Sequence, residues 1–363
     1  MAEIIRDFPP DRRRLSAFNA DAFAGQPVPH RDWFVEGQIP LRTVTQLSAD
    51  GGTGKSLIAN QVAVAAVTAT DSPIGIPRPG GVIYLSAEDD RDEIHRRLDA
   101  ITRARGLALD DLSALRIVPL AGEDAVLAGL RPGSQSIVAT PLWQALREEV
   151  LDLRPILVVL DTQADVFAGN ENDRSQVRQF VGMLRGLAIE ADLAVLLLAH
   201  PSLTGMSSGS GLSGSTAWNN SVRSRLYLER VKDESGVERD TDVRVLRTMK
   251  SNYSAKGAEI RLRYQDGRFV PDLGGGTAYG AAEADQVFLD LLAQFERQGR
   301  TVSPNSGANY APNEFAKHPD ALSISKVSFR AAMDRLLASG RVVIEDIGPP
   351  SRRLKALKRR DAE

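Results

Sequence analysis

Short runs of apolar residues alternate along much of the chain with segments whose apolar positions recur every three to four residues. The runs are typical of strands buried in a parallel sheet, and the segments are typical of helices that cover one. The pattern predicts strands at Thr43–Leu47, Gly81–Ser86, Leu115–Leu120, Ile156–Leu160 and Leu193–Ala199. It predicts helices from Lys55 to about Thr70, around Ile94, Leu98 and Ile101, at Pro141–Leu151 and at Asp173–Ala191. This alternation predicts an α/β fold with a mainly parallel central sheet, in which residues 121–138 form a loop or an insertion.

The pattern changes in the second half of the chain. A short helix at Trp218–Arg223 is predicted to precede antiparallel edge strands at Leu226–Val231, Val243–Met249, Glu259–Tyr264 and Arg268–Pro271. After a glycine-rich break, helices are predicted at Ala284–Gln298, Asn313–Lys317 and Ser325–Ser339, followed by a strand at Arg341–Glu345 and a basic tail. Helices followed by a hairpin outline a small winged-helix-like α+β domain, a module that binds duplex DNA or another protein.

These patterns divide the chain into four parts. We expect an N-terminal arm at 1–30, a large α/β domain at 31–273, a glycine-rich linker at 274–280 and the winged-helix-like domain at 281–363. The arm contains Pro9, Pro10, Pro27 and Pro29 and lacks sustained periodicity. It is either an extended segment that binds a neighbouring subunit or a disordered tail whose arginines are merely solvated.

Composition excludes several classes of protein. The chain has 363 residues, a formal net charge of −2, four histidines and no cysteine, so disulfides, thiolate metal sites and cysteine nucleophiles are absent. No apolar run approaches the roughly 20 residues that span a bilayer, and the first residues lack the apolar core of a signal peptide. We therefore expect a cytoplasmic protein without membrane contact. Basic residues cluster locally, at Arg12–Arg14 and in SRRLKALKRR near the end.

A glycine-rich turn joins the first predicted strand to the first predicted helix. Its residues are Gly51, Gly52, Thr53, Gly54, Lys55, Ser56 and Leu57. Backbone N–H groups in such a turn converge on a phosphate, and the start of the helix adds positive potential. Lys55 is expected to reach the β and γ phosphates of ATP, and the Ser56 hydroxyl to reach Mg²⁺. This is a Walker A motif in which Ala49 replaces the first glycine.

Asp161 closes the most apolar run of the chain, as expected for a Walker B carboxylate that holds magnesium, in part through water or the Ser56 hydroxyl. Thr162 follows it, where many nucleotide-driven motors have a glutamate that activates water. We expect Glu88, at the end of another strand, to act as this base. Alternatively, its neighbours Asp89 and Asp90 are helix caps and Glu88 is incidental.

His200 ends the last parallel strand and precedes a segment, 201–215, that is almost entirely Gly, Ser and Thr. An imidazole there can respond to the γ-phosphate, or it can simply cap the strand. The following segment is a candidate for gripping the phosphates of single-stranded DNA through backbone and hydroxyl groups. The alternative is plain flexibility. Further along, Arg223, Arg225, Arg247 and Lys250 supply positive charge, and each can also be an ordinary surface residue.

Several segments between about residues 30 and 265 together resemble the RepA-type plasmid replicative helicases, hexameric members of the RecA-like ATPases. They are WFVEGQIPLRTVTQLSADGGTGKS, GVIYLSAEDDRDEIHRRLDA, ILVVLDT, LLLAHPS, SGSTAWNNSVRSRLYLER and TMKSNYS. The resemblance implies a RecA-like fold, a ring of six and ATP at each subunit junction. It also implies that Arg223 completes the site of the adjacent subunit. Relatives in the DnaB branch have Lys-x-Arg where this chain has Lys250-Ser251-Asn252, so Lys250 is expected to be only an auxiliary nucleotide ligand.

The residues and the resemblance together predict an ATP-dependent translocase on single-stranded DNA, a replicative helicase of a plasmid, phage or other mobile element. Its 5′-to-3′ direction is implied by the resemblance alone. The smallest members of the family lack a domain like 281–363, which is a candidate for binding a primase, an origin protein or duplex DNA. Two alternatives stay open: a RecA-like ATPase that acts as a nucleotide-switched scaffold or loader, and a winged-helix DNA-binding regulator whose ATPase controls assembly.

Overall fold

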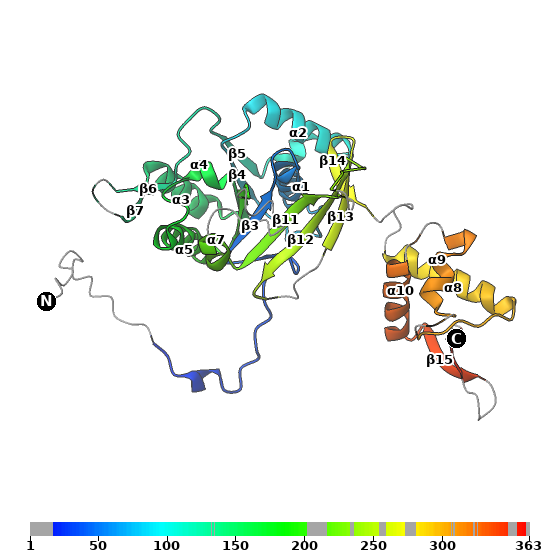
Figure 1. Ribbon diagram of the computed structural model, residues 1–363. Coiled ribbons are helices and arrows are strands. Elements are labelled where there is room, and N and C mark those ends of the chain that lie inside the picture. The colour runs from blue at the N-terminus through cyan, green and yellow to red at the C-terminus, as the bar shows by residue number, and fades with distance from the viewer. Residues whose placement is uncertain are drawn as a thin grey trace. The chain divides into compact units, whose positions relative to one another are not determined.

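The predicted apolar runs form strands of a nine-stranded sheet in the computed structural model (Figure 1). The structure describes residues 17–131, 133, 135–201, 216–232, 236–253, 259–272, 281–305, 307, 309–321, 324, 326–347 and 354–360. The strands are β3 (Val44–Ala49), β4 (Val82–Ser86), β5 (Leu115–Pro119), β8 (Leu157–Asp161), β10 (Ala194–Ala199), β11 (Ser224–Arg230), β12 (Val243–Ser251), β13 (Glu259–Gln265) and β14 (Arg268–Pro271). Their order in the sheet is β14-β13-β12-β11-β3-β10-β8-β4-β5.

The sheet has a parallel half and an antiparallel half. Strands β5, β4, β8, β10, β3 and β11 run parallel, and β11 to β14 form antiparallel pairs. β10 lies between β3, which leads into the glycine-rich turn, and β8, which ends at Asp161. The expected α/β fold with a mainly parallel central sheet is therefore confirmed. The carboxyl ends of the parallel strands meet at one edge, where ligands bind in such sheets.

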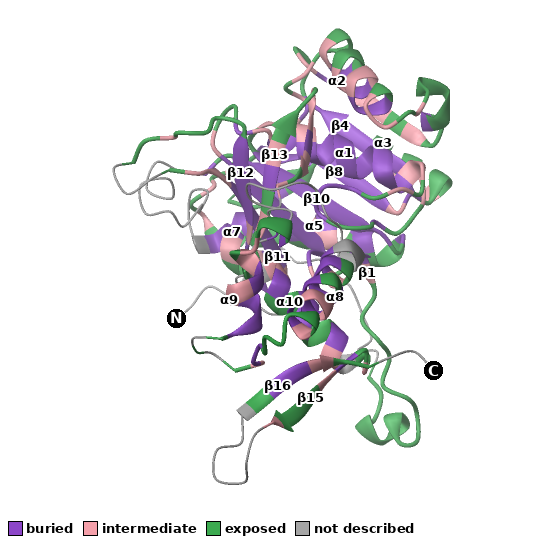
Figure 2. Cartoon of the chain, turned by 90° about the vertical axis from the view of Figure 1, so that its right-hand side faces the viewer, coloured by how far each residue is buried: buried purple, intermediate pink, exposed green. Residues whose placement is uncertain are grey.

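Helices cover both faces of the sheet. They are α1 (Lys55–Val67), α2 (Arg91–Arg103), α3 (Pro141–Leu153) and α5 (Arg174–Glu190). Side chains of α1 share one apolar cluster with the sheet, and those of α3 and α5 share another. Figure 2 shows the central strands and α1 buried between these layers. Most residues of α1 are buried because α2 packs against its other side. The glycine-rich turn is therefore followed by a helix that packs against the sheet on one side and against α2 on the other.

Three regions differ from the sequence-based expectation. Of the four strands expected to be antiparallel edge strands, β11 pairs parallel with β3 and only β14 lies at the edge of the sheet, because the pattern of a strand does not show which strands it pairs with. Residues 121–138, expected to be a loop or an insertion, contain strands β6 (Ala128–Leu130) and β7 (Ile137–Ala139), which form a small sheet with β9 (Phe167–Ala168). The basic tail contains β16 (Leu354–Arg359), which pairs antiparallel with β15 (Val342–Ile347). Strands of two or three residues are too short to show a period, and the lysines and arginines of β16 mask its alternation.

The C-terminal segment has its own apolar core, as expected for a small additional domain. Its helices are α8 (Ala281–Arg297), α9 (Ala311–Ala316) and α10 (Lys326–Ala338), followed by the β15–β16 hairpin. Phe315 is fully buried, and its ring lies 4.8 Å from that of Phe288, 5.2 Å from that of Phe295 and 5.9 Å from that of Phe329. Three helices and a hairpin thus surround one aromatic cluster, and the winged-helix assignment of this segment stays a prediction.

The remaining elements are short. They are η1 (Ala20–Phe23), β1 (Trp33–Val35), β2 (Ile39–Pro40), η2 (Leu109–Leu112), α4 (Gln163–Val166), α7 (Thr216–Ser221) and η3 (Pro319–Ala321). Residues up to Asp32 form a separate unit, in which every described residue is exposed. The segment expected to grip DNA lies, beyond Pro201, outside the described residues, as do residues 1–16 and the linker at 274–280. None of the described helices has the length and apolar character needed to cross a membrane.

The aromatic cluster gives a stability test. Phe315→Ala is expected to destabilise the protein by about 3–5 kcal/mol, because it removes a fully buried ring and leaves a cavity. Ile344→Ala is the control, because Ile344 is 46% exposed, and it is expected to cost less than about 1 kcal/mol. Urea denaturation of both variants beside the wild type measures the difference. Equal costs would show that the described packing around Phe315 is wrong.

Candidate functional site

The glycine-rich turn between β3 and α1 has the backbone conformation that the sequence predicts. Gly52 and Gly54 have positive φ angles of 68° and 105°. A Cβ atom at Gly54 would lie 2.5 Å from the ring of Phe269, so only glycine fits there. Lys55 and Ser56 follow as the first residues of α1, and both are buried. Their side chains therefore start from a fixed point at the positive end of a helix.

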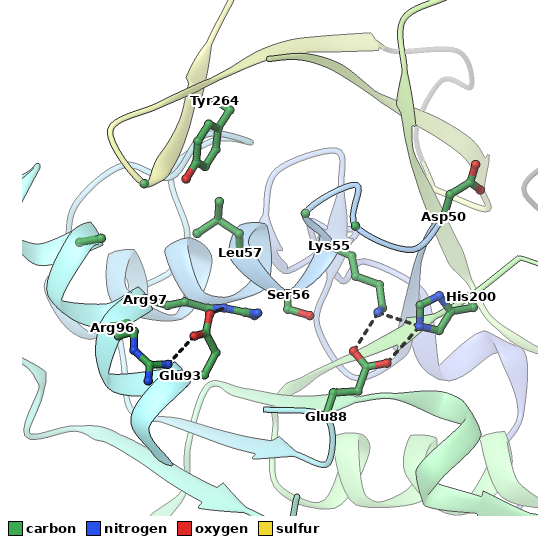
Figure 3. A pocket seen from close by; sticks show the side chains of 14 residues that line it. Asp50, Lys55, Ser56, Leu57, Glu88, Glu93, Arg96, Arg97, His200 and Tyr264 are labelled. Atoms are coloured by element: carbon green, nitrogen blue, oxygen red, sulfur yellow. Dashed lines mark hydrogen bonds and ion pairs between the residues drawn. The ribbon is translucent and has the colours of Figure 1, made fainter. Parts of the chain in front are cut away.

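The structure brings Lys55, Glu88 and His200 together at the carboxyl edge of the sheet (Figure 3). Lys55 Nζ lies 3.3 Å from Glu88 Oε2 and 3.0 Å from His200 Nε2, and His200 Nε2 lies 3.1 Å from Glu88 Oε1. Each residue comes from a different segment: the start of α1, the turn after β4 and the end of β10. A lysine, a carboxylate and an imidazole are thus held within hydrogen-bonding distance of one another.

Burial alone would raise the pKa of Glu88, but the contact with His200 and the charge of Lys55 outweigh it. The pKa of Glu88 is therefore lowered, and its side chain is a carboxylate at neutral pH. A carboxylate is the form that can accept a proton from water. The alternative role of its neighbours as helix caps is correct for Asp90, whose Oδ1 accepts a hydrogen bond from Glu93 N at 2.8 Å. Asp89 instead pairs with Arg97 at 2.5 Å.

Asp161 ends β8 and is fully buried. The Tyr84 hydroxyl donates a hydrogen bond of 2.8 Å to its Oδ2. Burial raises the pKa of Asp161, and the nearby Lys55, Ser56 and Tyr84 oppose that rise. Its Oδ1 has no hydrogen-bond partner within the part of the chain that the structure describes. A buried carboxylate oxygen without a donor, beside a serine hydroxyl, suits a hard cation that prefers oxygen ligands.

A cavity of about 600 Å³ surrounds these groups. Besides the predicted residues Gly52, Gly54, Lys55, Ser56, Leu57, Glu88 and His200, its lining includes Asp50, Glu93, Arg96, Arg97, Ala100, Tyr264 and Gly267. Figure 3 shows Tyr264 facing Leu57 across one end of the cavity, with Arg97 beside Ser56. The sequence reasoning missed this second group. For α2 a signal exists, since Glu93, Arg96 and Arg97 share a helical face just after Glu88.

Tyr264 and Gly267 reach the cavity because the β13–β14 hairpin is tied to α1. Gln61 Nε2 donates to Phe269 O, and Phe269 N donates to Gln61 Oε1, both at 2.8 Å. The predicted strands in this region revealed the hairpin but not its position beside α1. Contacts made across about two hundred residues of chain have no local signal in the sequence.

Arg223 and Lys250 lie at the other end of their strands. Ser224, the first residue of β11, pairs with Thr45, and the Arg223 backbone N–H donates to Val44 O, so both precede the length of β3 that leads to the turn. Lys250 Nζ donates to the carbonyls of Asn219 and Val222, next to the end of α7. Within one chain, neither residue lines the cavity. The action of Arg223 on a neighbouring subunit and the auxiliary role of Lys250 stay predictions.

Comparisons with known proteins bear on this site and on the fold that carries it. A family model described as "AAA domain" matches residues 9–206, more than half of the chain. This range includes the glycine-rich turn, Glu88, Asp161 and His200. Among solved structures, the crystal structure of the RadB recombinase is similar, with a TM-score of 0.45 and 16% sequence identity. That match covers 64% of this chain and 92% of the other.

The lowered pKa of Glu88 leads to a pH-dependent stability difference. Glu88→Gln is expected to lower the Tm at pH 7, because it leaves the buried ammonium of Lys55 without its counter-charge. The carboxylate stabilises the fold fully above the ordinary glutamate pKa of 4.5, and this contribution disappears as the pH falls through the lowered folded value. The difference in Tm between wild type and variant should therefore shrink below pH 4.5.

Thermal unfolding between neutral and acid pH measures this difference. Glu123→Gln, at an exposed glutamate, is the control for the loss of one negative charge. A Glu88→Gln difference that is constant with pH, or no larger than that of the control, would contradict the assignment.

Proposed function

The chain belongs to the AAA domain family, and we propose that it is an ATP-hydrolysing ring translocase on single-stranded DNA that serves as the replicative helicase of a plasmid, phage or other mobile element. The observation that carries the ATP-dependent part is the cluster of Lys55, Glu88 and His200 at a glycine-rich turn. It combines an anion-binding lysine with a carboxylate base and an imidazole. That is the set of groups needed to bind a triphosphate and to activate water against it.

Each residue has a role in this proposal. The backbone N–H groups of the turn and Lys55 bind the phosphates. Glu88 orients the attacking water and accepts its proton, a role that its ionised state supports. His200, in contact with both, responds to the presence or loss of the γ-phosphate. Its position just before Pro201 puts it at the start of the segment expected to contact DNA.

Ser56 and Asp161 are the residues that would hold Mg²⁺. Asp161 Oδ1, which is buried and has no hydrogen-bond partner in the described chain, and the Ser56 hydroxyl provide the oxygen ligands. Bound there, the ion would neutralise charge on the β and γ phosphates. Tyr84 keeps the Asp161 carboxylate in place through its own hydrogen bond.

The ion pairs of the arginines that line the cavity support assembly into a ring. Arg96 pairs with Glu93, and Arg97 pairs with both Glu93 and Asp89, so their charges are already balanced. In this proposal a further cation that stabilises transition-state charge, besides Lys55 and the metal ion, comes from elsewhere. Arg223 is half-buried at the far end of β11, where a neighbouring subunit can use it. In this proposal Arg223 completes the site of the next subunit, in a homo-oligomer of six.

The C-terminal domain is proposed to recruit a further partner, which is a primase, an origin protein or duplex DNA. Exposed basic residues on α10 (Lys326 and Arg330) and on β16 (Lys355 and Arg359) favour duplex DNA. The same residues are the specific support for the alternative function, a DNA-binding regulator whose ATPase controls assembly. The scaffold or loader alternative shares the whole nucleotide site and differs only in lacking strand separation.

One experiment tests the proposal. The mass of the particle is measured with and without ATP and Mg²⁺, and unwinding of a forked DNA is then measured on the same sample. The proposal predicts a particle of six subunits that hydrolyses ATP faster when DNA is present and separates the strands of the fork. Hydrolysis without unwinding would favour the scaffold or loader. Duplex binding that is lost in Lys326→Glu/Arg330→Glu, while hydrolysis persists without unwinding, would favour the regulator.

Two variants separate binding from chemistry. Lys55→Ala is expected to abolish hydrolysis, because it removes the phosphate-binding cation. Glu88→Gln is expected to bind ATP and form the ring but to lose turnover by at least about a hundredfold, the scale of one general base. Asp92→Asn, an exposed carboxylate on α2, is the matched control and should keep wild-type turnover. Full turnover in Glu88→Gln would show that another group is the base.

Arg223 is tested by mixing subunits. Arg223→Ala and Lys55→Ala rings are each expected to be inactive, because one lacks the donated arginine and the other lacks the phosphate-binding lysine. Mixed rings should regain part of the activity, since some junctions then combine an intact Lys55 with an intact Arg223. Mass measurement must show that mixed rings form. Mixed rings without recovery would rule out action between subunits.

A further inference from the structure

Two arginines and a glutamate are linked to the phosphate-binding turn through its backbone carbonyls. Arg230, the last residue of β11, donates to Gly51 O at 3.3 Å, and Arg244, near the start of β12, donates through Nε to Thr53 O at 3.3 Å. Glu238, in the connection between these strands, binds both arginines: Oε2 lies 3.2 Å from Arg230 Nη1 and Oε1 lies 2.9 Å from Arg244 Nη1. One carboxylate thus holds two guanidinium groups against the turn.

The carbonyls that these arginines bind fix the direction of the adjacent N–H groups. In a trans peptide the C=O and the next N–H point in opposite directions. A donor at Gly51 O therefore turns the N–H of Gly52 away from the arginines, and a donor at Thr53 O does the same for the N–H of Gly54. Anion binding in such a turn requires N–H groups that converge on one side. The arginines stabilise the peptide orientation that phosphate binding needs.

Glycines make this support necessary. Gly52 and Gly54 have positive φ, and a turn with several glycines has many other backbone conformations of similar energy. Holding it in one conformation costs entropy that a bound phosphate would otherwise have to overcome. Hydrogen bonds from fixed, charged donors reduce that cost before the nucleotide arrives.

Burial indicates which contact matters most. The side chain of Arg244 is 9% exposed and that of Glu238 is 15% exposed, whereas that of Arg230 is 35% exposed. Arg244 also donates through Nη1 to the carbonyls of Thr241 and Val243, at 2.7 and 2.8 Å. Its guanidinium therefore joins the phosphate-binding turn to the start of β12. A lysine has one donor atom and cannot make the Nε and Nη1 contacts together.

We propose that Arg244 and Arg230, held by Glu238, are positioning residues that keep the phosphate-binding turn in its binding conformation. This inference rests on the proposed function, in that the turn must bind ATP. The three residues act through the backbone of the turn and not by contact with the reacting atoms. Their loss should therefore weaken binding of ATP more than it slows the chemical step.

The central variant is Arg244→Lys, which keeps the charge and removes the forked geometry. Its Kd and KM for ATP with Mg²⁺ are expected to rise about tenfold or more, the scale of one hydrogen bond from a charged donor, while kcat at saturating ATP changes little. Glu238→Gln should give a smaller rise of the same kind, because one acceptor oxygen remains. Arg261→Lys is the matched control, because Arg261 lies on the same sheet and its guanidinium pairs with Asp272.

The readouts are ATP binding by titration calorimetry, steady-state hydrolysis and the Tm without nucleotide. Arg244→Lys that binds ATP like the wild type would overturn the inference, as would a lowered Tm with unchanged Kd, which indicates a purely structural role. If Arg244→Lys does not fold, the more exposed Arg230→Lys replaces it, and an unchanged Kd there would also overturn the inference. A wild-type protein that binds no ATP would instead refute the proposed function, and this inference with it.

Discussion

A buried ammonium group requires a counter-charge, and this requirement governs the arrangement around Lys55. The side chain of Lys55 is 7% exposed, and Glu88 is its ionic partner. If ATP binds as proposed, its phosphates would supply the negative charge beside Lys55, and the pairing with Glu88 would no longer be needed. The same charge balance that stabilises the site without nucleotide thus frees the proposed base when nucleotide binds. His200, in contact with both residues, lies where that exchange of partners takes place.

The sheet topology makes this charge balance possible. Lys55, Glu88 and His200 are separated by 33 and 112 residues in the chain, yet each directly follows the carboxyl end of a parallel strand or its turn. Strands β3, β10, β8 and β4 are consecutive neighbours in the sheet, so the residues that follow them share one edge. Asp161 ends β8 between the strands that supply His200 and Glu88. The relative positions of these four side chains are therefore set mainly by the order of the strands in the sheet.

The position of a site residue relative to its strand determines whether the sequence could reveal it. The strands that precede Lys55, Glu88, Asp161 and His200 are apolar and long enough to recognise, so the residues after them could be identified before the structure was known. Tyr264 lines the cavity because of the way the β13–β14 hairpin is attached to Gln61, which no local pattern encodes. Arg230 and Arg244 were hidden for a similar reason, since arginine is usually a surface residue and their strands, expected at the edge, lie inside the sheet. β16 escaped notice because its charged residues obscure the alternation of a strand.

Strands β11 and β12 run from the phosphate-binding turn to the region of Arg223. At one end Arg230 and Arg244 hold the phosphate-binding turn, and at the other Arg223 precedes β11 while Lys250 is close to the end of β12. The two strands are paired along their whole length in antiparallel register, with one shift between Arg225 and Leu226. Through these contacts the turn and the strand end that carries Arg223 belong to one continuous hydrogen-bonded pair of strands. In a ring where Arg223 serves the neighbour, this pair of strands would join one subunit's nucleotide to the next subunit's site.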